Sequence, residues 1–368
     1  MYLKDLSLIN FKNYQEFSAN FSPKINCFVG NNGSGKTNLL DAIHYLSLCK
    51  SFFNAIDSQN IRNSENYFLI QGHFEKNGEV DAVYCGLKRN QKKVFKKNTK
   101  EYQKLSEHIG QFPLVMISPN DNELIWGVSE VRRKFIDSII SQYDRVYLDS
   151  LIAYNSAVKQ RNSLLKQFSR NQTMDSALLE IWDEQLIIYG NTLISKRTDF
   201  LSSFIPMFNH FYEILSDHKE EVSLVYEDSL DHRDFKTALL TCLAKDRILE
   251  YTTVGPHKDD LEFKINHMAL KKFASQGQQK SYLLALKLAQ FQYIKDKKHT
   301  KPLLLLDDVY DKLDEARFSK LIELVKGNEF GQVFITDTHL DRMQQLFGDH
   351  AVDHKLFVVN NAEVNELV

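Results

Sequence analysis

Eight residues near the amino terminus carry the most specific chemistry in the sequence. From Gly30 to Thr37 the chain reads GNNGSGKT, which fills every fixed position of the pattern G-x-x-x-x-G-K-[ST]. Glycines let the backbone curl so that its N–H groups point at phosphate oxygens, and a helix that starts there adds its positive end. In such a loop Lys36 reaches the β- and γ-phosphates, and the hydroxyl of Thr37 is offered to Mg²⁺. The stretch predicts a site for a nucleoside triphosphate.

The loop residues that we expect to contact the nucleotide are Gly30, Asn31, Asn32, Gly33, Ser34, Gly35, Lys36, Thr37 and Asn38.

An acidic pair, Asp307 and Asp308, ends the apolar run LLLLDD. A bound Mg²⁺ needs a second oxygen ligand at the end of a buried strand. We expect Asp307 to hold the metal directly or through water, and Asp308 to orient or deprotonate the attacking water. A strand-end carboxylate can also cap a helix, but the glycine loop favours the metal interpretation.

A third turn precedes the acidic strand, in FASQGQQKSYLLALKLAQ. Ser275 and Gly277 open the helix that follows, so its first amides also face an anion. Taken alone, SQGQQ is typical of an ordinary helix cap. Together with the other two elements, it predicts a contact with the nucleotide of a second, head-to-tail subunit.

Strands and helices flank these motifs in alternation. KINCFV reads as the strand before the glycine loop, TNLLDAIHYLSL as the half-buried helix after it, and YFLIQGHFEK with EVDAVYCGLK as a hairpin around Asn77-Gly78. Towards the carboxyl end, LEFKI, PLLLLDD and GQVFIT read as strands, and QQKSYLLALKLAQFQYIKD and EARFSKLIELVK as helices. The apolar run of Leu303 to Leu306 suits a parallel strand covered on both faces.

The middle of the chain differs in composition. Between Val128 and Val254 there is one glycine, Gly190, and one proline, Pro206. This predicts consecutive helices, which form either a projecting arm or a helical cap. We therefore expect an α/β fold: a P-loop ATPase core of residues 1–105 plus 250–368, with a mostly helical lobe of residues 106–249 inserted.

The bulk composition excludes several classes. No apolar run approaches the ~20 residues of a membrane span, and the start lacks the zones of a signal peptide, so we expect a cytoplasmic protein with no membrane contact. The four scattered cysteines suit reduced thiols. With a net charge of −2, any DNA contact must come from a local patch or a dimer groove.

The sequence resembles the RecF family, within the SMC-like branch of the ABC ATPases, over nearly its full length. The resemblance rests on the amino-terminal block LSLINFKNYQEFSANFSPKINCFVGNNGSGKTNLLDAIHYLSLCKSF, on TTVGPHKDDLEF, on SQGQQKSYLLALKLAQ and on LLLLDDVYDKLDEARFSKL. Transporter motors have the signature turn much nearer the glycine loop, and true SMC proteins insert hundreds of coiled-coil residues. Neither pattern fits.

The resemblance implies an ATP-dependent homodimer that loads onto double-stranded and gapped DNA. With RecO and RecR it would help to place RecA on the gapped strand, in replication-fork recovery and the SOS response. It implies ATP and Mg²⁺ as cofactors, and weak, DNA-dependent ATP hydrolysis coupled to dimer opening.

The resemblance also assigns residues by position. The trans-acting signature would be Ser275, Gly277 and Gln278, with Lys36, Asp308 and Ser275 as the catalytic set. Asp314 would be the D-loop residue, and Lys12 and Asn13 would lie against the nucleotide. Thr338 and His339 are weak candidates for the switch position, no glutamine occupies the Q-loop segment SPNDNEL, and Phe53 stands where the family often has arginine.

Residues 88–100, KRNQKKVFKKNTK, hold seven basic residues and no acid. They resemble a basic β-ribbon that follows a phosphate backbone through Lys92, Lys93, Lys96 and Lys97. A solvated charged face is the alternative.

Two other polar groups have open interpretations. Arg132 and Arg133 would be a second DNA contact or a helix-surface pair, and we favour the pair slightly. His257 and Asp259 would be a metal or acid–base pair, or part of a structural loop, which we favour because further ligand spacing is missing.

Two rival functions remain. A P-loop kinase would use the helical insert as an acceptor lid, work as a monomer and leave the signature turn without a role. A scaffold with a vestigial ATPase is disfavoured by the intact set of Lys36, Thr37, Asp307 and Asp308.

Overall fold

A computed structural model describes residues 1–171, 175–216, 220–231, 233–308, 315–327, 329–347 and 353–367. The chain divides into two compact units: Met1–Asp121 with Lys280–Val368, and Asn122–Gln279. Both boundaries of the second unit lie later in the sequence than the expected ones near 105 and 250. The reason is strand pairing, since β8 (Leu114–Ile117) belongs to a sheet of the first unit and β10 (Asp260–Ile265) to the sheet of the second.

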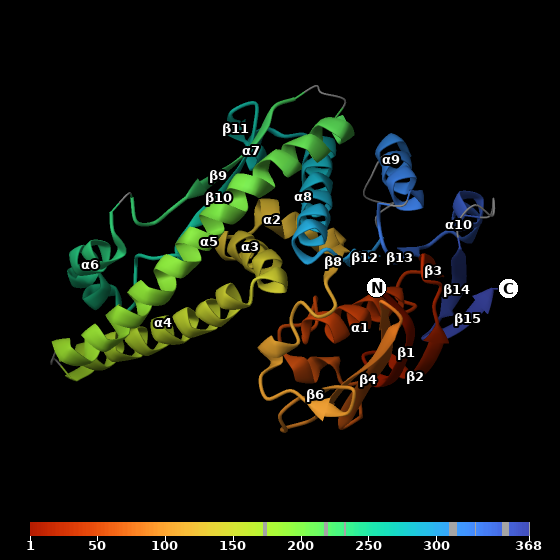
Figure 1. Cartoon of the computed structure of the whole chain (residues 1–368), viewed down its shortest axis with the longest axis horizontal. Helices are drawn as coiled ribbons and strands as arrows, with labels where there is room; N and C mark the ends of the chain where they lie inside the picture. The colour runs from red at the N-terminus through yellow and green to blue at the C-terminus, as the bar shows by residue number, and fades with distance from the viewer. Residues whose placement is uncertain are drawn as a thin grey trace. The chain divides into compact units, whose positions relative to one another are not determined.

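A six-stranded sheet of the first unit holds the expected glycine-loop and acid strands (Figure 1). Its order is β15-β14-β3-β13-β12-β8, where β14 to β8 are parallel and β15 is antiparallel to β14. Every leucine of β12 is buried, as the apolar run predicts. The other strands are β3 (Ile25–Val29), β13 (Val333–Asp337), β14 (His354–Asn360) and β15 (Glu363–Leu367).

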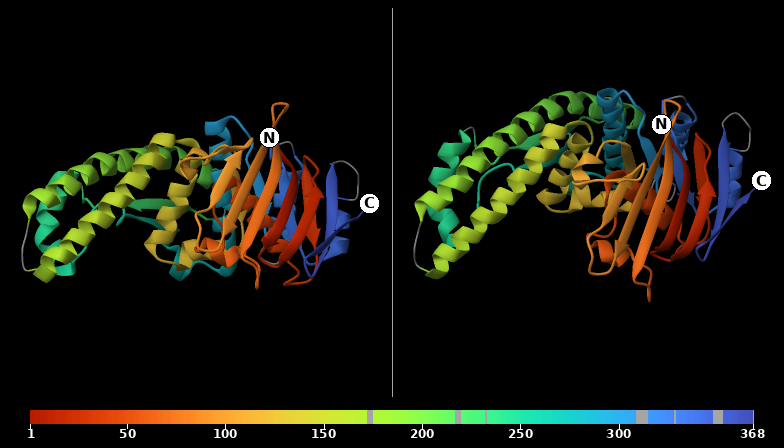
Figure 2. Two further views of the ribbon diagram at one scale, coloured as in Figure 1. Left: turned by 90° about the horizontal axis from the view of Figure 1, so that it is seen from below. Right: turned by 60° about the horizontal axis from the view of Figure 1, so that its bottom comes forward.

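The second sheet of this unit is antiparallel, with the order β2-β1-β4-β5-β6-β7, and Figure 2 shows its long strands side by side. The expected hairpin is confirmed: Lys76 pairs with Glu79, and both Asn77 (φ 55°) and Gly78 (φ 84°) have the left-handed backbone of a tight hairpin turn. The strands are β1 (Tyr2–Phe11), β2 (Tyr14–Asn20), β4 (Tyr67–Lys76), β5 (Glu79–Lys88), β6 (Val94–Lys97) and β7 (Lys100–Glu101).

One hydrophobic core joins both sheets to α1 (Lys36–Leu48). Leu39, Ile43 and Leu46 of this helix are buried at the spacing that the sequence indicates. The further helices of the unit are α9 (Glu315–Lys326), α10 (Leu340–Phe347) and the short 3₁₀ turns Asp57–Asn60, Leu105–Glu107 and Pro119–Asn122.

The second unit is mostly helical, as expected, and adds a small sheet that the sequence analysis did not foresee in full. Its helices are α2 (Glu123–Trp126), α3 (Ser129–Tyr143), α4 (Arg145–Asn171), α5 (Ser176–Ser216), α6 (Phe235–Leu249) and α7 (Leu270–Phe273). The antiparallel sheet has the order β11-β10-β9, with β9 at Val222–Glu227 and β11 at Met268–Ala269. Helix α8 (Gln276–Lys298) begins in this unit and ends in the first.

Two arginines are fully buried in the second unit. Arg161 of α4 pairs with Asp183 (2.5 Å) and Asp246 (2.6 Å), and Arg197 of α5 pairs with Asp137 (2.8 Å). Because an unpaired buried charge is costly, these ion pairs fix how α4 and α5 pack within the unit.

None of the helices in the described ranges combines the length and apolar character needed to cross a membrane.

Candidate functional site

The glycine loop follows β3 and turns into α1 through two left-handed glycines. Gly33 has φ 81° and Gly35 has φ 119°, a backbone that L side chains rarely adopt. A Cβ at Gly35 would also lie 2.8 Å from the hydroxyl of Tyr14, and one at Gly30 would lie 2.1 Å from the carbonyl oxygen of Val359. Glycine is therefore required by both backbone shape and close packing.

The Lys36 side chain is 4% exposed and lies along the inside of the loop. Its amine donates to the carbonyl oxygens of Gly30 (2.7 Å) and Asn31 (3.1 Å). These bonds hold a positive charge against the inside of the glycine loop, which is where a loop of this sequence pattern receives a phosphate group.

Asn13 and Tyr14 brace the loop from outside. Asn13 donates to the carbonyl of Ser34 (3.4 Å) and accepts from the side-chain amide of Asn38 (2.7 Å), while the Tyr14 hydroxyl donates to the carbonyl of Gly35 (3.1 Å). The structure thus brings the expected residue Asn13 to the loop.

Lys12 lies differently from the expectation that it contacts the nucleotide. Its amine pairs with the fully buried carboxylate of Asp41 at 2.6 Å and lies over the ring of Phe53, 5.2 Å from the centroid. Since Asp41 has no other cation within ion-pair distance among the described residues, its charge requires Lys12. The side chain of Lys12 is therefore a structural partner of α1.

The two motifs at opposite ends of the sequence meet beside this loop. The Thr37 hydroxyl donates to Oδ1 of Asp307 at 2.9 Å, and Thr336 donates to the same oxygen at 2.9 Å. Thr336 lies at the end of β13, the strand between β3 and β12. Thr336 was not predicted from the sequence, because its place follows from sheet order rather than from a local motif.

Burial raises the pKa of Asp307 to about 6, although the bonds from Thr336 and Thr37 oppose the shift. A buried carboxylate beside a hydroxyl, both hard oxygen donors, fits a Mg²⁺ ion, since a divalent cation would replace the missing positive charge. Thr37 and Asp307 are the residues that would hold it.

Asp308 has a left-handed backbone, with φ 46°. Its N–H donates to the Thr336 hydroxyl at 2.9 Å, so the same threonine positions both acids. The side chain is half-buried. It follows the carboxyl end of β12, at the same edge of the parallel sheet from which the glycine loop leaves β3.

The serine-bearing turn lies in the second unit and is exposed. The Ser275 hydroxyl accepts from the N–H of Gln278 (3.2 Å), and the Gln278 side chain accepts from the N–H of Ser275 (2.6 Å), which is a reciprocal capping box. Gln278 also donates to Glu220 at 2.8 Å. Ser275 and Gly277 remain open to solvent or half-buried, so the turn is accessible to a second molecule.

The remaining expected positions are the D-loop residue and the two switch candidates. Asp314, the expected D-loop residue, lies outside the described residues. Of the switch candidates, Thr338 is half-buried and His339 is exposed, whereas the preceding Asp337 is ion-paired to Arg342 (2.9 Å).

In the Q-loop segment, the buried Asp121 pairs with Lys287 of α8 at 2.6 Å. This pair was not predicted from the sequence. An acidic residue in a loop and a lysine within an otherwise apolar helix could have indicated it.

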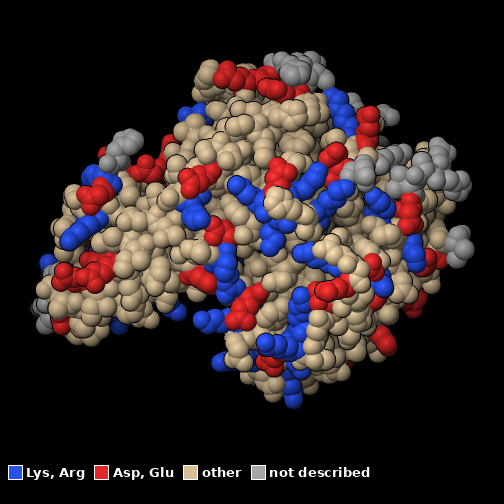
Figure 3. Space-filling model, in the orientation of Figure 1, with Lys and Arg blue, Asp and Glu red and all other residues tan. Residues whose placement is uncertain are grey.

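The basic ribbon is less free than its composition suggests. Lys93 is largely buried; its amine bonds to Asp57 (2.8 Å), to the carbonyl of Cys49 (2.6 Å) and to the Tyr45 hydroxyl (3.1 Å). Lys97 pairs with Asp81 at 2.7 Å. Lys92 is exposed and Lys96 half-buried. Lys93 is thus a correction to the expected ribbon, because its charge is used inside the fold. On the face in Figure 3, Lys and Arg side chains are interspersed with Asp and Glu.

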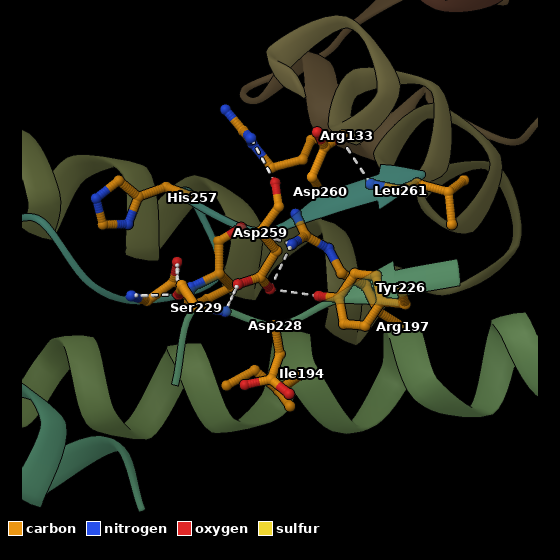
Figure 4. A network of polar contacts seen from close by, with 12 residues as sticks. Arg133, Ile194, Arg197, Tyr226, Asp228, Ser229, His257, Asp259, Asp260 and Leu261 are labelled. Carbon is orange, nitrogen blue, oxygen red and sulfur yellow. Dashed lines mark hydrogen bonds and ion pairs between the residues drawn. The ribbon is translucent and has the colours of Figure 1, made fainter. Parts of the chain in front are cut away.

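The loop of His257 and Asp259 is a polar network within the second unit (Figure 4). Asp259 accepts from Tyr226 and from the N–H of Ser229 (2.9 Å), and Arg197 lies 3.6 Å away. Across the described ranges, no three His, Cys, Asp or Glu side chains gather as a metal site. Arg132 forms a bidentate pair with Asp260 (2.7 and 2.8 Å). The favoured structural interpretation of these groups agrees with these contacts.

Comparison with known proteins identifies the class. The profile described as "RecF/RecN/SMC N terminal domain" matches residues 2–357. An SMC head domain from Pyrococcus furiosus superimposes with a TM-score of 0.57 at 16% identity, over 100% of this chain and 96% of that one, which is a likeness of fold. The fold and the site define an ABC-type ATPase head of the SMC kind.

The relatives narrow the class to a family. The DNA replication and repair protein RecF of Phocaeicola vulgatus is 49% identical over 368 residues, covering 100% of this chain and 98% of the relative. That of Flavobacterium johnsoniae is 50% identical over 357 residues, with 97% and 99% covered. A solved structure of the recombination mediator protein RecF with ATP, from the RecFOR pathway, is 31% identical, with a TM-score of 0.90 over 100% of this chain and 98% of that one. The chain belongs to the RecF family.

Proposed function

We propose that this chain binds ATP with Mg²⁺ at the glycine loop and acts, as an ATP-dependent homodimer, as a recombination mediator on DNA. The observation that carries the proposal is the 2.9 Å contact of Thr37 with Asp307, which unites the two nucleotide motifs in one preformed site. The solved RecF–ATP structure, which is similar over the whole chain, supports the same ligand.

Each residue of the site has a distinct role in this proposal. The loop amides and Lys36 bind the phosphates, and Thr37 with Asp307 would hold Mg²⁺. The metal, when bound, neutralises phosphate charge. Asp308, fixed by Thr336, orients the attacking water and accepts its proton. Asn13 and Tyr14 keep the loop curled by bonding its carbonyls, so its amides stay directed inwards.

The second half of the nucleotide site comes from the Ser275 turn of the other subunit. The turn is exposed and its capping box holds the first amides of α8 in place, so it offers prearranged donors to an anion. With the partner's turn over the triphosphate, ATP binding closes the dimer and weak hydrolysis opens it.

The cellular role follows the family. We propose loading of the ATP-bound dimer onto double-stranded DNA near gaps, cooperation with RecR and RecO to place RecA, and roles in replication-fork recovery and the SOS response in the cytoplasm. The similar RecF of known structure, described as a recombination mediator in the RecFOR pathway, supports this.

Light scattering of the wild type and of Asp308→Asn, with and without ATP, tests the dimer. Loss of the water-activating carboxylate slows hydrolysis, so ATP-dependent dimers should persist longer in the variant. Asn shares the readiness of Asp for a left-handed backbone, which keeps the local fold. A monomer under every condition would favour the kinase alternative.

Duplex binding at different salt concentrations tests the ribbon. Lys92→Gln combined with Lys96→Gln should weaken binding to any sequence and lower the salt slope by up to about 2, since each phosphate contact contributes about 0.9. The matched control, Lys236→Gln on exposed α6, should leave the slope unchanged. An unchanged slope in the double variant would remove the ribbon from the DNA contact.

A further inference from the structure

The second unit contains a partly open cavity of about 470 Å³ that the nucleotide site does not use. It lies among α3, α4, α5 and the loop before β10, beside the network in Figure 4. Its charged and polar lining includes Arg133, Lys134, Asp137, Arg197, His257 and Lys258.

Most charges around this cavity are paired with each other. Arg197 is neutralised by Asp137 (2.8 Å), and Lys134 by Glu130 (2.6 Å). The nearby Asp260 is held by Arg132 at 2.7 Å. Asp259 adds a second carboxylate beside Arg197, at 3.6 Å. These groups build the walls and leave no positive charge free for a ligand.

Arg133 and Lys258 are different. The guanidinium of Arg133 donates to a backbone carbonyl, that of Asp259, at 2.5 Å. The amine of Lys258 lies 4.6 Å from the centroid of the Tyr251 ring. In the described part of the chain, neither cation has a carboxylate within ion-pair distance. Both cations are therefore available to a ligand.

Arg133 and Lys258 lie close enough to repel each other. Burial and then the charge of Arg197 lower the pKa of Arg133, while the carboxylates of Asp260, Asp259 and Glu130 oppose this shift. Burial and then the charge of Arg133 lower the pKa of Lys258, and Asp246 opposes this shift. His257 adds no charge at neutral pH, because burial lowers its pKa to about 4. Its Nε2 lies 3.1 Å from the carbonyl of Thr252 and its Nδ1 lies 2.7 Å from the Tyr154 hydroxyl, which suits a neutral ring. An anion in the cavity would relieve this repulsion.

We propose that this cavity is a second anion site, in which Arg133 and Lys258 bind a phosphate monoester. Two cations without an ion-pair partner in the described ranges can both contact one phosphomonoester, whose charge is close to −2 at neutral pH. The fork of Arg133 suits two phosphate oxygens, and Lys258 supplies a point charge. A volume of about 470 Å³ holds a ligand of nucleotide size, so we assign the phosphate to a free nucleotide or to a strand terminus.

Calorimetry in a Lys36→Ala background tests the site without phosphate binding at the glycine loop. Thymidine 5′-monophosphate should bind this protein, and Arg133→Gln with Lys258→Gln should weaken binding at least tenfold. Lys166→Gln, which removes an exposed charge of α4 that does not line the cavity, is the matched control and should bind as the parent. If the double variant does not fold, Lys258→Gln alone, at an exposed position, should still weaken binding several-fold.

Single-stranded oligothymidylates with and without a 5′-phosphate distinguish the two sources. A preference for the phosphorylated strand over the mononucleotide assigns the site to a strand terminus, and equal affinity assigns it to free nucleotides. No binding of either ligand, equal affinity in the cavity variants, or displacement by a short polyglutamate peptide would overturn the phosphate assignment. Since Lys36→Ala already disables the proposed ATP site, these outcomes are independent of the ATP-dependent dimer.

Discussion

The glycine loop and the Ser275 turn both present helix amides to an anion, but they differ in how the chain uses them. Residues of the same chain hold the loop in place: Lys36 is 4% exposed, and Thr37 is bonded to Asp307. The Ser275 turn is exposed, and its side-chain bonds serve its own helix and Glu220. One half of the proposed nucleotide site is thus assembled within the chain, and the other half is displayed to solvent. In the proposed dimer, ATP bound at the loop of one copy would contact the Ser275 turn of the other.

Ser275→Asp should break this arrangement most severely. Aspartate caps a helix as well as serine does, so the turn is kept, but its charge repels a triphosphate by several kcal/mol. The dissociation constant of the ATP-bound dimer should rise at least about 100-fold, as measured by light scattering, with monomer nucleotide affinity unchanged. Ser275→Asn, a neutral cap, should dimerise nearly as well as the wild type. Equal dimerisation of Asp and Asn variants would contradict the trans contact.

Lys36→Ala should disable the other half. Removal of two charge-assisted bonds to phosphate, each about 1.5–3 kcal/mol, should weaken ATP binding at least about 100-fold. Fluorescent-nucleotide titration measures this, and the variant should also remain monomeric. Tight ATP binding by the variant would show that the nucleotide lies elsewhere.

Asp307→Asn should show that the buried carboxylate beside the glycine loop lowers the free energy of unfolding. Because burial raises the pKa of Asp307 from 3.8 to about 6, the folded protein holds this proton more tightly than the unfolded chain. Wild-type stability therefore falls as pH rises from about 4 to about 6 and stays lower above that range. The variant should gain up to about 3 kcal/mol at pH 8 and nothing below pH 4.

Urea unfolding at both pH values measures this gain, and ATP affinity of the same variant should lose its dependence on Mg²⁺. A variant less stable than the wild type at pH 8 would contradict the expected cost of the ionised carboxylate.

Asn13→Ala should have the smallest effect. It removes a brace of the loop, the bonds to Ser34 and Asn38, worth about 0.5–1.5 kcal/mol. ATP affinity should fall between about twofold and tenfold, with dimerisation retained at saturating ATP. Asn171→Ala at the exposed end of α4 should change neither quantity.

Local signals predicted much of the fold. The glycine loop, the hairpin at Asn77-Gly78 and the buried strand at Leu303–Leu306 each depend on a few adjacent residues, and each forms as expected. Strand β9 was missed because its six residues are embedded in a region of helical composition.

Contacts between distant residues were not predictable in this way. Thr336 contacts Asp307 because sheet order places β13 beside β12, and Lys93 is buried because Asp57 and Tyr45 fold against it. The ion pair of Lys12 was not predictable for the same reason, since its partner Asp41 follows the glycine loop in the sequence and Lys12 precedes it. Charge composition identified these lysines but not whether their charges are already matched by internal partners.

The left-handed backbone of Asp308 restricts what mutation can place there. At φ 46°, Asp and Asn are tolerated far better than longer or β-branched residues, which strain the chain by roughly 1–2 kcal/mol. A glutamate at this position would carry this backbone strain. The backbone conformation at the end of β12 therefore favours aspartate over glutamate as the acidic residue at this position.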